Sequence, residues 1–452
     1  ATLLHLGPGF ANGLANLHNA RRARTPILNI VGDHAVAHLQ YDTPLTSNID
    51  AYAAATEGWW RRSREAASLS ADIADALTAS CAGPGRTATV IVPADHMWTD
   101  DVRPADPSKP DGLGEVPDSL IEDVAEKCRR GGVALLLGGN NGLEEALAAA
   151  GRIRDACGAH LFVDTFMPRL ERGAGRVEVA RLPYFADWIA DTLKDVQHLI
   201  LVGANPPASF FAYKDQPSLA APKGCEILTL ATPREDGARA LDALARALDA
   251  PGEPQRRAAG GLPELPAGEL TAESVAASLA HLMPENAIVS DEATTAGLPL
   301  FDATAGAAPH SWLCLTGGAI GQGMPAAIGA AIACPDRKVI NLQADGSAMY
   351  TLQALWTEAR ENLDITTVIY ANHAYEILKF EMIKTGLVET AGATAQKLVS
   401  LAEPRIDWVK AAEGMGVAAE RATTAEDFHA ALERALDHKG PRLIEANIKP
   451  LF

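Results

Sequence analysis

The strongest constraint on the fold of this chain is an alternation of two apolar patterns that covers most of its length. Short runs rich in Val, Ile and Leu alternate with longer segments in which apolar residues recur at helical spacing. The short runs lie at residues 2–6, 26–31, 87–92, 133–137, 160–163, 198–202, 288–290, 338–342 and 366–370. Continuous apolar runs separated by helices are typical of parallel strands whose two faces are both covered. The sequence therefore predicts an α/β fold with doubly wound parallel sheets.

Two segments interrupt this alternation and indicate linkers. Residues 103–117 and 251–268 are rich in Pro and Gly and have few periodic apolar positions. A chain of 452 residues is also too long for a single hydrophobic core. We therefore predict three domains, at residues 1–103, 118–250 and 269–452.

Net charge, hydropathy and cysteine content disfavour several classes of protein. A formal net charge of -18 disfavours binding to the phosphate backbone of nucleic acid. No apolar run approaches the roughly 18 residues that a membrane-spanning helix needs. The 6 cysteines are scattered, without a C-x-x-C pair or the His spacing of a zinc site, which favours a reduced, cytoplasmic protein. We expect neither a nucleic-acid partner nor a membrane.

A single carboxylate follows one of the predicted strands, in the stretch NLQADGSAM. Apolar residues resume at helical spacing from Met349 to Ala359, which places Asp345 and Gly346 in a turn between strand and helix. The next predicted strand leads to Asn372. Because the carboxyl ends of neighbouring strands line the ligand crevice of a doubly wound sheet, we expect Asp345 and Asn372 to meet there.

The chemistry of these side chains indicates a magnesium site. A carboxylate, an amide oxygen and a backbone carbonyl after Asn372 are hard ligands of the kind that Mg²⁺ prefers. Amide groups near Ser347, at the start of the helix, would add binding of an anion. Asp345 is therefore predicted to hold a metal ion that neutralises a diphosphate. Because Asp-Gly is also a common turn dipeptide, a purely structural turn is the alternative.

The spacing of 27 residues between Asp345 and Asn372 resembles the G-D-G…N motif of thiamine-diphosphate-dependent enzymes. TGGAIGQGMPAAIGAAIACPDRKVINLQADGSAMYTLQALW and YANHAYEIL resemble the diphosphate-binding domain of acetolactate synthase and benzoylformate decarboxylase. HLGPGFANGLANLHNARRARTPILNIVGDH and TATVIVPAD resemble their pyrimidine-binding domain. The resemblance implies three domains in the order pyrimidine-binding, central dinucleotide-binding-like and diphosphate-binding.

The resemblance implies a set of cofactor contacts around the motif. The implied Mg²⁺ ligands are Asp345, Asn372 and the carbonyl of Ala374, and the implied diphosphate contacts are Gly346 and Ser347. The first glycine of the motif is replaced by Ala344, which narrows the allowed backbone conformations but leaves the ligands unchanged.

Two further residues match catalytic positions of the family. Ile320, in GGAIGQG, matches the bulky aliphatic residue that bends the cofactor, although a core Ile at a helix start fits as well. His5, in LLHLGPGFAN, matches a catalytic histidine of the benzoylformate decarboxylase branch, and its ordinary pKa suits proton transfer near neutral pH. A His bonded to backbone at a strand end is the alternative. His34 and His38 lie near the same domain edge and are interpreted as loop residues.

The resemblance also implies roles for two further groups of residues. It implies that residues after the strand at 288–290 contact the cofactor, and that residues after Asn372 line the substrate pocket. They are Asp291, Glu292, Thr294 and Thr295 in the first group, and Tyr375, Ile377 and Leu378 in the second. Helix capping explains the first group equally well, and an apolar helix face explains the second.

The implied activity is decarboxylation of a 2-oxo acid with thiamine diphosphate and Mg²⁺. The product is either an aldehyde or, after carboligation, an acetohydroxy acid. The family places its active site between two subunits, so a homodimer or homotetramer is expected. The family's activating glutamate would fall before Ala1. We expect it upstream, because a domain that starts at this strand would lack part of its sheet.

Two alternative functions compete with this interpretation. The stretch VALLLGGNNGLEEA, with its glycine turn at residues 138–142 and Asp164 after the next strand, is compatible with a dinucleotide-dependent oxidoreductase. Its glycines do not follow the G-x-G-x-x-G pattern, and some relatives hold FAD in this domain without redox turnover. The second alternative is a noncatalytic scaffold that lacks the activating glutamate.

Overall fold

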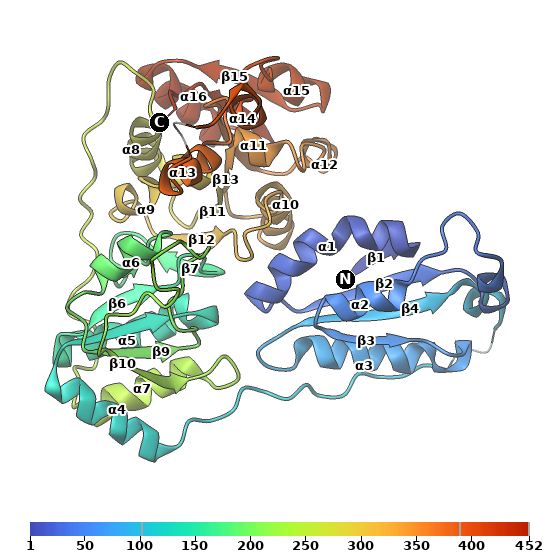
Figure 1. Cartoon of the computed structure of the whole chain (residues 1–452), viewed down its shortest axis with the longest axis horizontal. Coiled ribbons are helices and arrows are strands. Elements are labelled where there is room, and N and C mark those ends of the chain that lie inside the picture. Colours follow the sequence, from blue (N-terminus) through green and yellow to red (C-terminus); the bar gives the residue numbers. More distant parts are fainter. Residues whose placement is uncertain (101–102, 388–389, 451–452) are drawn as a thin grey trace. The chain divides into compact units, whose positions relative to one another are not determined.

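The computed structural model describes residues 1–100, 103–387 and 390–450. Its strands form three sheets with the orders β1-β2-β4-β3, β10-β9-β5-β6-β8 and β15-β16-β14-β13-β11-β12-β7 (Figure 1). We call them the first, second and third sheet. Each predicted apolar run lies in a strand of one of these sheets, so the predicted α/β class is confirmed.

The chain divides into two compact units. Unit 1 comprises Ala1–Pro117, Ala231–Gly237 and Thr316–Ala319, and unit 2 comprises Asp118–Leu230, Ala238–Leu315 and Ile320–Phe452. Unit 1 holds the first sheet. Its main elements are β1 (Thr2–His5), α1 (Leu6–Ala23), β2 (Ile27–Asp33), η1 (Val36–Tyr41), α2 (Ile49–Ala55), β3 (Trp59–Arg62), α3 (Leu69–Cys81) and β4 (Thr87–Pro93).

Helices cover both faces of the first sheet (Figure 1). Phe10 of α1 and Ile49 of α2 pack with Ile91 of β4 in one buried cluster. The preceding residue of the strand, Val90, points to the opposite face and packs with Ala76 of α3. Because side chains alternate between the two faces of a strand, neighbouring residues of β4 supply two separate cores.

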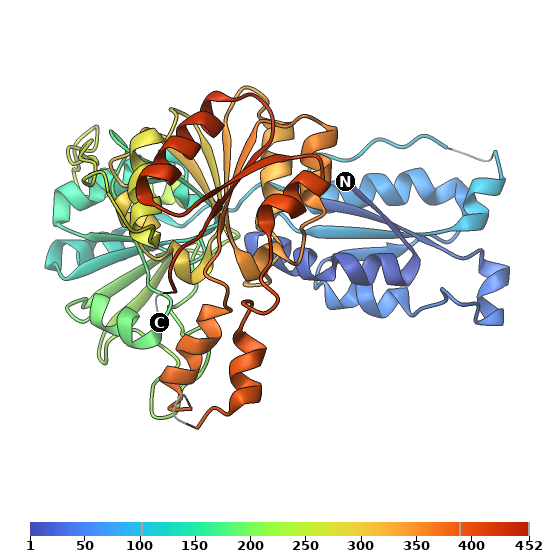
Figure 2. The ribbon, with the colours of Figure 1, turned by 90° about the horizontal axis from the view of Figure 1, so that it is seen from above.

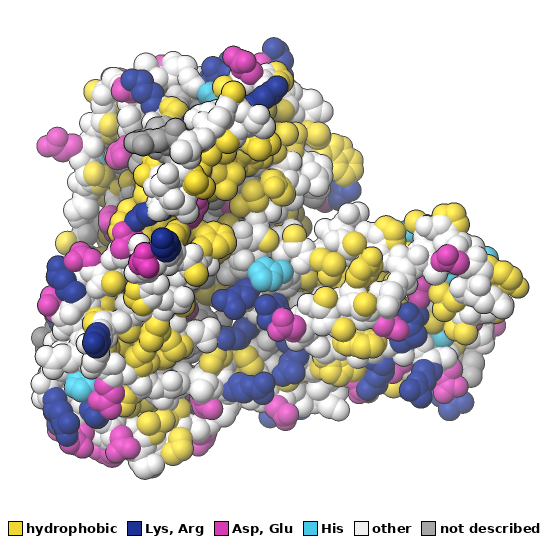
Figure 3. Space-filling view, viewed as in Figure 1, with side chains coloured by type: hydrophobic (Ala, Val, Ile, Leu, Met, Phe, Trp, Pro, Cys, Tyr) yellow, Lys and Arg dark blue, Asp and Glu magenta, His cyan; other side chains and the backbone are white. Residues whose placement is uncertain are grey.

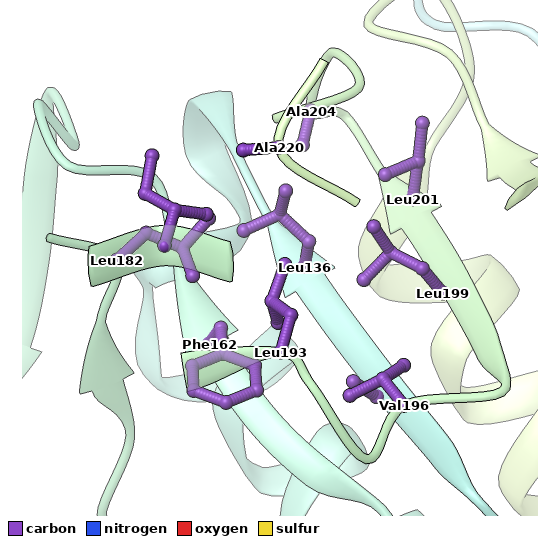
Figure 4. Packing of buried hydrophobic residues seen from close by; sticks show 11 residues of the cluster. Leu136, Phe162, Leu182, Leu193, Val196, Leu199, Leu201, Ala204 and Ala220 are labelled. Carbon is purple, nitrogen blue, oxygen red and sulfur yellow. The ribbon is translucent and has the colours of Figure 1, made fainter. Parts of the chain in front are cut away.

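The second sheet begins unit 2. Its elements are α4 (Asp118–Arg130), β5 (Val133–Leu137), η4 (Gly139–Gly142), α5 (Glu144–Cys157), β6 (His160–Val163), β8 (Ala180–Arg181), α6 (Ala186–Thr192), β9 (His198–Val202), β10 (Glu226–Ala231) and α7 (Gly237–Ala247). Strands β9, β5, β6 and β8 pair in parallel. On one face, Leu136, Phe162, Leu193 and Leu199 form a buried cluster (Figure 4).

The third sheet carries the residues of greatest interest. Its elements are β7 (Arg169–Arg172), α8 (Ala272–Leu282), β11 (Ile288–Glu292), η5 (Thr294–Gly297), α9 (Leu300–Ala303), β12 (His310–Cys314), α10 (Gly323–Ala333), β13 (Val339–Ala344), α11 (Asp345–Ala348), α12 (Ala354–Arg360), β14 (Ile365–Tyr370), α13 (Glu376–Lys384), α14 (Ala393–Val399), α15 (Trp408–Gly414), β15 (Ala418–Ala422), α16 (Ala425–Asp437) and β16 (Arg442–Ala446). All its strand pairs are parallel except the edge pair of β7 with β12.

Helices also cover both faces of the third sheet. Helices α10, α12 and α15 pack on one face, around Leu355 and the fully buried Trp408. Figure 2 shows α8 and α16 on the opposite face, and α13 beside α14 at one end of the sheet. The sheet is therefore buried on both sides, as the continuous apolar runs of β13 and β14 predict.

The two predicted linkers contain no helix or strand over residues 103–117 and 251–268. The predicted domain boundaries at 103, 118, 250 and 269 remain predictions. Within the described ranges, no helix combines the length and the apolar character needed to cross a membrane. All six cysteines are free thiols.

Candidate functional site

Asp345 lies at the carboxyl end of β13, in the middle of the third sheet. Strand β13 pairs in parallel with β14, with Ala344 opposite Tyr370. Asp345 follows directly and is 1% exposed. The sequence predicts a turn at Asp345 and Gly346, and in the structure these two residues begin the one-turn helix α11. The helix predicted from 349 onward is also shorter than its apolar pattern indicates, because α12 begins only at Ala354.

The carboxylate of Asp345 contacts the loop that follows β14. Its Oδ1 accepts a hydrogen bond from Gly346 N at 2.8 Å, and its Oδ2 accepts one from His373 N at 2.7 Å. His373 lies between Asn372 and Ala374 and has the left-handed backbone conformation, with φ 58°. The predicted meeting of these two segments at adjacent strand ends is therefore present in the structure.

The loop after β14 is itself held in a defined conformation. Asn372, which is 6% exposed, accepts a hydrogen bond at Oδ1 from Ala374 N at 3.1 Å. Tyr375 N donates to Val399 O at 2.9 Å and Leu401 N donates to His373 O at 2.8 Å. This short antiparallel pairing uses the groups on either side of Ala374, so the carbonyl of Ala374 lies outside the ladder.

A second buried carboxylate, Glu376, lies beside the same amide. Its Oε2 accepts a hydrogen bond from Asn372 Nδ2 at 2.8 Å, and the residue is 3% exposed. No sequence pattern predicts a role for Glu376. The only available signal was its spacing of four residues from Asn372, which places the two side chains within reach when a helix starts between them.

Burial raises the pKa of Asp345 to about 7, hydrogen bonds from His373 and Gly346 oppose this rise, and the charge of Glu376 adds to it. In the described part of the chain, no group of three or more His, Cys, Asp or Glu side chains forms a metal cluster. The donors here are one carboxylate, one amide oxygen and one carbonyl. This set fits Mg²⁺, which keeps its other positions for water and phosphate, and the cation would offset the buried negative charge.

Close packing explains why Gly346 is glycine. A Cβ atom on Gly346 would lie 2.5 Å from Cε1 of Tyr375, so the ring of Tyr375 occupies the space of a side chain. The preceding residue, Ala344, has φ -67° and ψ 145°, a conformation that any residue adopts. Replacement of the motif's first glycine by alanine therefore causes no strain here.

We expect Gly346→Ala to destabilise the protein by about 1–3 kcal/mol, because the new methyl group must displace the ring of Tyr375. Denaturant unfolding measures this loss. Gly329→Ala is the matched control, since a Cβ there meets no atom within 4 Å. In the Tyr375→Ala background the penalty of Gly346→Ala should largely disappear. An equal loss of stability in both backgrounds would show that the methyl group at position 346 does not clash with the ring of Tyr375.

Thr294 and Thr295 follow β11 in the short 3₁₀ helix η5, which packs near β13 and α13. Neither caps a helix, because the residue before η5 is Ala293 and makes no side-chain cap. Thr294 is exposed and has φ 52°, an unusual conformation for a β-branched residue. The buried Oγ1 of Thr295 has no hydrogen-bond partner among the described residues. A strained backbone and an orphaned hydroxyl fit contacts with a bound group.

The other expected residues of unit 2 lie on segments that adjoin the third sheet. Ser347 is 3% exposed in α11, and Ile320 is half-buried just before α10. Tyr375 and Ile377 are half-buried at the start of α13, whereas Leu378 is 47% exposed. Leu378 is the most exposed of these three residues, and their expected place in the wall of a substrate pocket remains a prediction.

His5 belongs to unit 1, where it ends β1 opposite Gly32 of β2. Its side chain is exposed. His34 follows β2 at the same edge of the first sheet, and its ring centroid lies 5.5 Å from that of His38 in η1. The structure therefore gathers His5 and His34 at the carboxyl edge of the first sheet.

The glycine turn of the second sheet has a structural explanation. Strand β5, turn η4 and helix α5 are present as predicted. Asn141 Nδ2 donates to Gly138 O at 2.9 Å and to Val202 O at 3.1 Å. A Cβ atom on Gly138 would lie 2.6 Å from Oδ2 of Asp164. Neighbouring atoms of the chain itself fill the space beside Gly138. The need for glycine at this position is therefore explained without a bound nucleotide.

Comparison with known proteins gives consistent matches. Residues 301–446 match the family model of the thiamine pyrophosphate enzyme C-terminal TPP-binding domain. The chain is 49% identical over 454 residues to IlvX of Mycobacterium tuberculosis, named as an acetolactate synthase-type large subunit, and the match covers 100% of this chain and 87% of that protein. It is 33% identical over 268 residues to benzoylformate decarboxylase of Pseudomonas aeruginosa, covering 56% of this chain and 49% of that protein.

A solved structure has the same fold over nearly the whole chain. The thiamine diphosphate-dependent 4-hydroxybenzoylformate decarboxylase of Rhodococcus jostii RHA1 matches with a TM-score of 0.84. The match has 23% sequence identity and covers 99% of this chain and 87% of that one. At this identity the match concerns the fold, which agrees with the three-sheet α/β architecture.

Proposed function

Because this chain belongs to the thiamine pyrophosphate enzyme family, we propose that it uses thiamine diphosphate and Mg²⁺ to decarboxylate a 2-oxo acid. The observation that carries this proposal is the buried carboxylate of Asp345, which contacts the Asn372–Ala374 loop through His373 N. A cation would stabilise the negative charge that is buried at this strand end, and the neighbouring oxygens are ligands of the kind that Mg²⁺ prefers.

The residues around this carboxylate have separate roles in the proposal. Asp345, Asn372 Oδ1 and the Ala374 carbonyl would hold Mg²⁺, with Glu376 orienting the amide of Asn372. The buried hydroxyl of Thr295 would bond the cofactor. The remaining cofactor contacts in the proposal are Gly346, Ser347, Thr294, Tyr375 and Ile377.

When bound, thiamine diphosphate supplies a nucleophilic carbon and an electron sink for the loss of carbon dioxide from a 2-oxo acid. The chain's own residues bind, orient and move protons. Ile320 would hold the cofactor in a bent shape. His5, exposed at the edge of the first sheet, would donate or accept a proton at the substrate. If a proton is delivered to the carbon that has lost carbon dioxide, the product is an aldehyde. If protonation at this carbon is slow, carboligation to a second 2-oxo acid can occur instead.

A panel of 2-oxo acids tests the reaction. The protein is incubated with thiamine diphosphate and Mg²⁺, and carbon dioxide, aldehyde and acyloin products are measured together. The proposal expects carbon dioxide release from at least one short aliphatic or aromatic 2-oxo acid, and the ratio of aldehyde to acyloin then assigns the branch. Absence of carbon dioxide with every acid, from protein that binds the cofactor, would reject the proposed reaction.

We expect His5→Ala to slow turnover by about 100-fold while cofactor affinity stays unchanged, because a lost general acid or base affects proton transfer and not binding. Steady-state kinetics and calorimetry measure the two quantities. His160→Ala is the control, since His160 is also an exposed strand residue but lies in the second sheet. Wild-type turnover in His5→Ala would remove this residue from the mechanism.

We also propose a homodimer or homotetramer in a cytoplasmic location. Hydrophobic side chains gather on the surface of unit 2 around α12 (Figure 3). Met349 and Tyr350, between α11 and α12, and Trp356 of α12 are 47%, 59% and 51% exposed. Exposed apolar patches mark contact surfaces. Light scattering should report two or four chains per particle, and a monomer would contradict the proposal.

A further inference from the structure

Glu292, the last residue of β11, is a buried carboxylate that holds a loop far away in the sequence. It is 2% exposed. Its Oε1 accepts a hydrogen bond from Gly321 N and its Oε2 accepts one from Gly323 N, both at 2.6 Å. Charge-assisted hydrogen bonds of this length are among the strongest that a side chain makes to the backbone.

The loop has the residues that this arrangement requires. Gly321 has φ 98°, a conformation that side chains other than glycine rarely adopt. A Cβ atom on Gly323 would lie 2.8 Å from Oε2 of Glu292 and would also collide with the amide of Gln343. The two glycines therefore let the backbone approach the carboxylate closely enough for both N–H groups to reach it.

Other side chains fasten the same loop. Ser290 Oγ donates to Gly323 O at 2.9 Å, and Gln322 Nε2 donates to Cys314 O at 2.9 Å. Gln343 donates to Oε2 of Glu292 at 3.2 Å when its amide nitrogen faces the carboxylate. Burial raises the pKa of Glu292, and the N–H groups of the loop oppose that rise. Glu292 thus lies at the centre of a polar network between β11, β13 and α10.

The first of the two N–H groups belongs to the peptide bond that joins Ile320 to Gly321. A carboxylate that fixes this N–H fixes the orientation of the peptide plane, and with it the direction in which the Ile320 side chain leaves the backbone. We propose that Glu292 is a positioning residue that sets the location of Ile320 by holding the loop at Gly321 and Gly323. The inference rests on the proposed function, in which Ile320 bends the cofactor.

Amide hydrogen exchange of the cofactor-free protein tests the clamp itself. In Glu292→Gln, the side chain keeps its size but loses its charge and one acceptor, so exchange at Gly321 and Gly323 should be about 10- to 100-fold faster. Glu285→Gln is the matched control, because Glu285 is exposed just before the same strand. Unchanged exchange in Glu292→Gln would overturn the proposal. If that variant does not fold, Glu292→Asp, which keeps the charge but shortens its reach, is compared in the same way.

A double-mutant cycle tests whether Glu292 acts through Ile320. Calorimetry with thiamine diphosphate and Mg²⁺ should show about 10-fold weaker binding in Glu292→Gln and in Ile320→Ala. The double variant should be no weaker than the worse single variant, because the second change removes what the first already displaces. Fully additive losses would overturn the positioning role. If wild-type protein binds no cofactor, the proposed function fails, whereas the exchange measurement still decides whether the clamp exists.

Discussion

Asp345→Ala should abolish retention of thiamine diphosphate, with a loss of affinity of more than about 100-fold in the presence of Mg²⁺. The variant removes the one carboxylate that the proposal assigns to the metal, and the diphosphate charge is then uncompensated. The fold should survive, because the buried negative charge of Asp345 is itself a cost in the cofactor-free protein, where burial raises its pKa to about 7. Calorimetry at fixed Mg²⁺ measures the effect.

Asp336→Ala is the matched control for this experiment. Asp336 is exposed in the turn before β13, so it lies at the opposite end of the same strand from Asp345. Its variant should bind the cofactor as the wild type does. Unchanged affinity in Asp345→Ala, with a normal unfolding transition, would mean that the metal and the diphosphate bind elsewhere.

Glu358→Gln should stabilise the protein at alkaline pH by up to roughly 4 kcal/mol. Glu358 lies in α12 and is 0% exposed. Neither of its carboxyl oxygens has a hydrogen-bond partner in the described ranges of the chain. Burial raises the pKa of Glu358 from 4.5 to about 8, so at higher pH the folded protein contains a buried, unpaired charge. Glutamine has nearly the same shape and no charge.

The pH dependence follows from the direction of this shift. The folded state binds the proton of Glu358 more tightly than the unfolded state, so its contribution to stability is complete below pH 4.5 and is lost as pH rises to about 8. Denaturant unfolding at pH 5, 7 and 9 should therefore show the two proteins diverging with pH. Glu361→Gln, at an exposed neighbour, should leave the profile unchanged. Parallel profiles for Glu358→Gln and wild type would show that Glu358 is not a buried acid.

The strands that the sequence predicted are mostly interior ones. β13 and β14 are buried on both faces and read as continuous apolar runs. Several of the strands that the pattern did not predict lie at sheet edges, namely β3, β7, β8, β10 and β15. The WWRR of β3 and the RLER of β7 carry charged residues, so neither strand has an apolar signature. β3 is partly exposed, as edge strands often are, whereas β7 is buried except for Arg169. The EILTLA of β10 does contain apolar residues, and its short run was not recognised as a strand.

An interior strand was missed for a different reason. β16 carries the fully buried Glu445, whose charge interrupts the apolar run. Arg421 compensates this charge across the sheet, with its Nη2 at 2.9 Å from the carboxylate. Glu445 and Arg421 are far apart in sequence and have no recognisable spacing. Compensation of this kind is visible only in three dimensions.

In the candidate site, too, some residues could be predicted from the sequence and others could not. Asp345 and Asn372 could be placed because each follows an apolar strand, and parallel strands bring their carboxyl ends together. The roles of Glu376 and Glu292 could not be predicted. The role of Glu376 depends on where the helix after Tyr375 begins. The role of Glu292 depends on backbone N–H groups about 30 residues later in the chain. Hydrogen bonds to backbone groups leave no residue pattern, because any residue except proline can donate them.

The most direct test of the account is a crystal structure of the wild-type protein with thiamine diphosphate and Mn²⁺ in place of Mg²⁺, with the metal located by its anomalous signal. We expect one metal peak at about 2.1–2.3 Å from the carboxylate of Asp345, Oδ1 of Asn372 and the carbonyl of Ala374, with diphosphate oxygens completing the coordination. A bound cofactor whose metal makes no contact with Asp345 would contradict it.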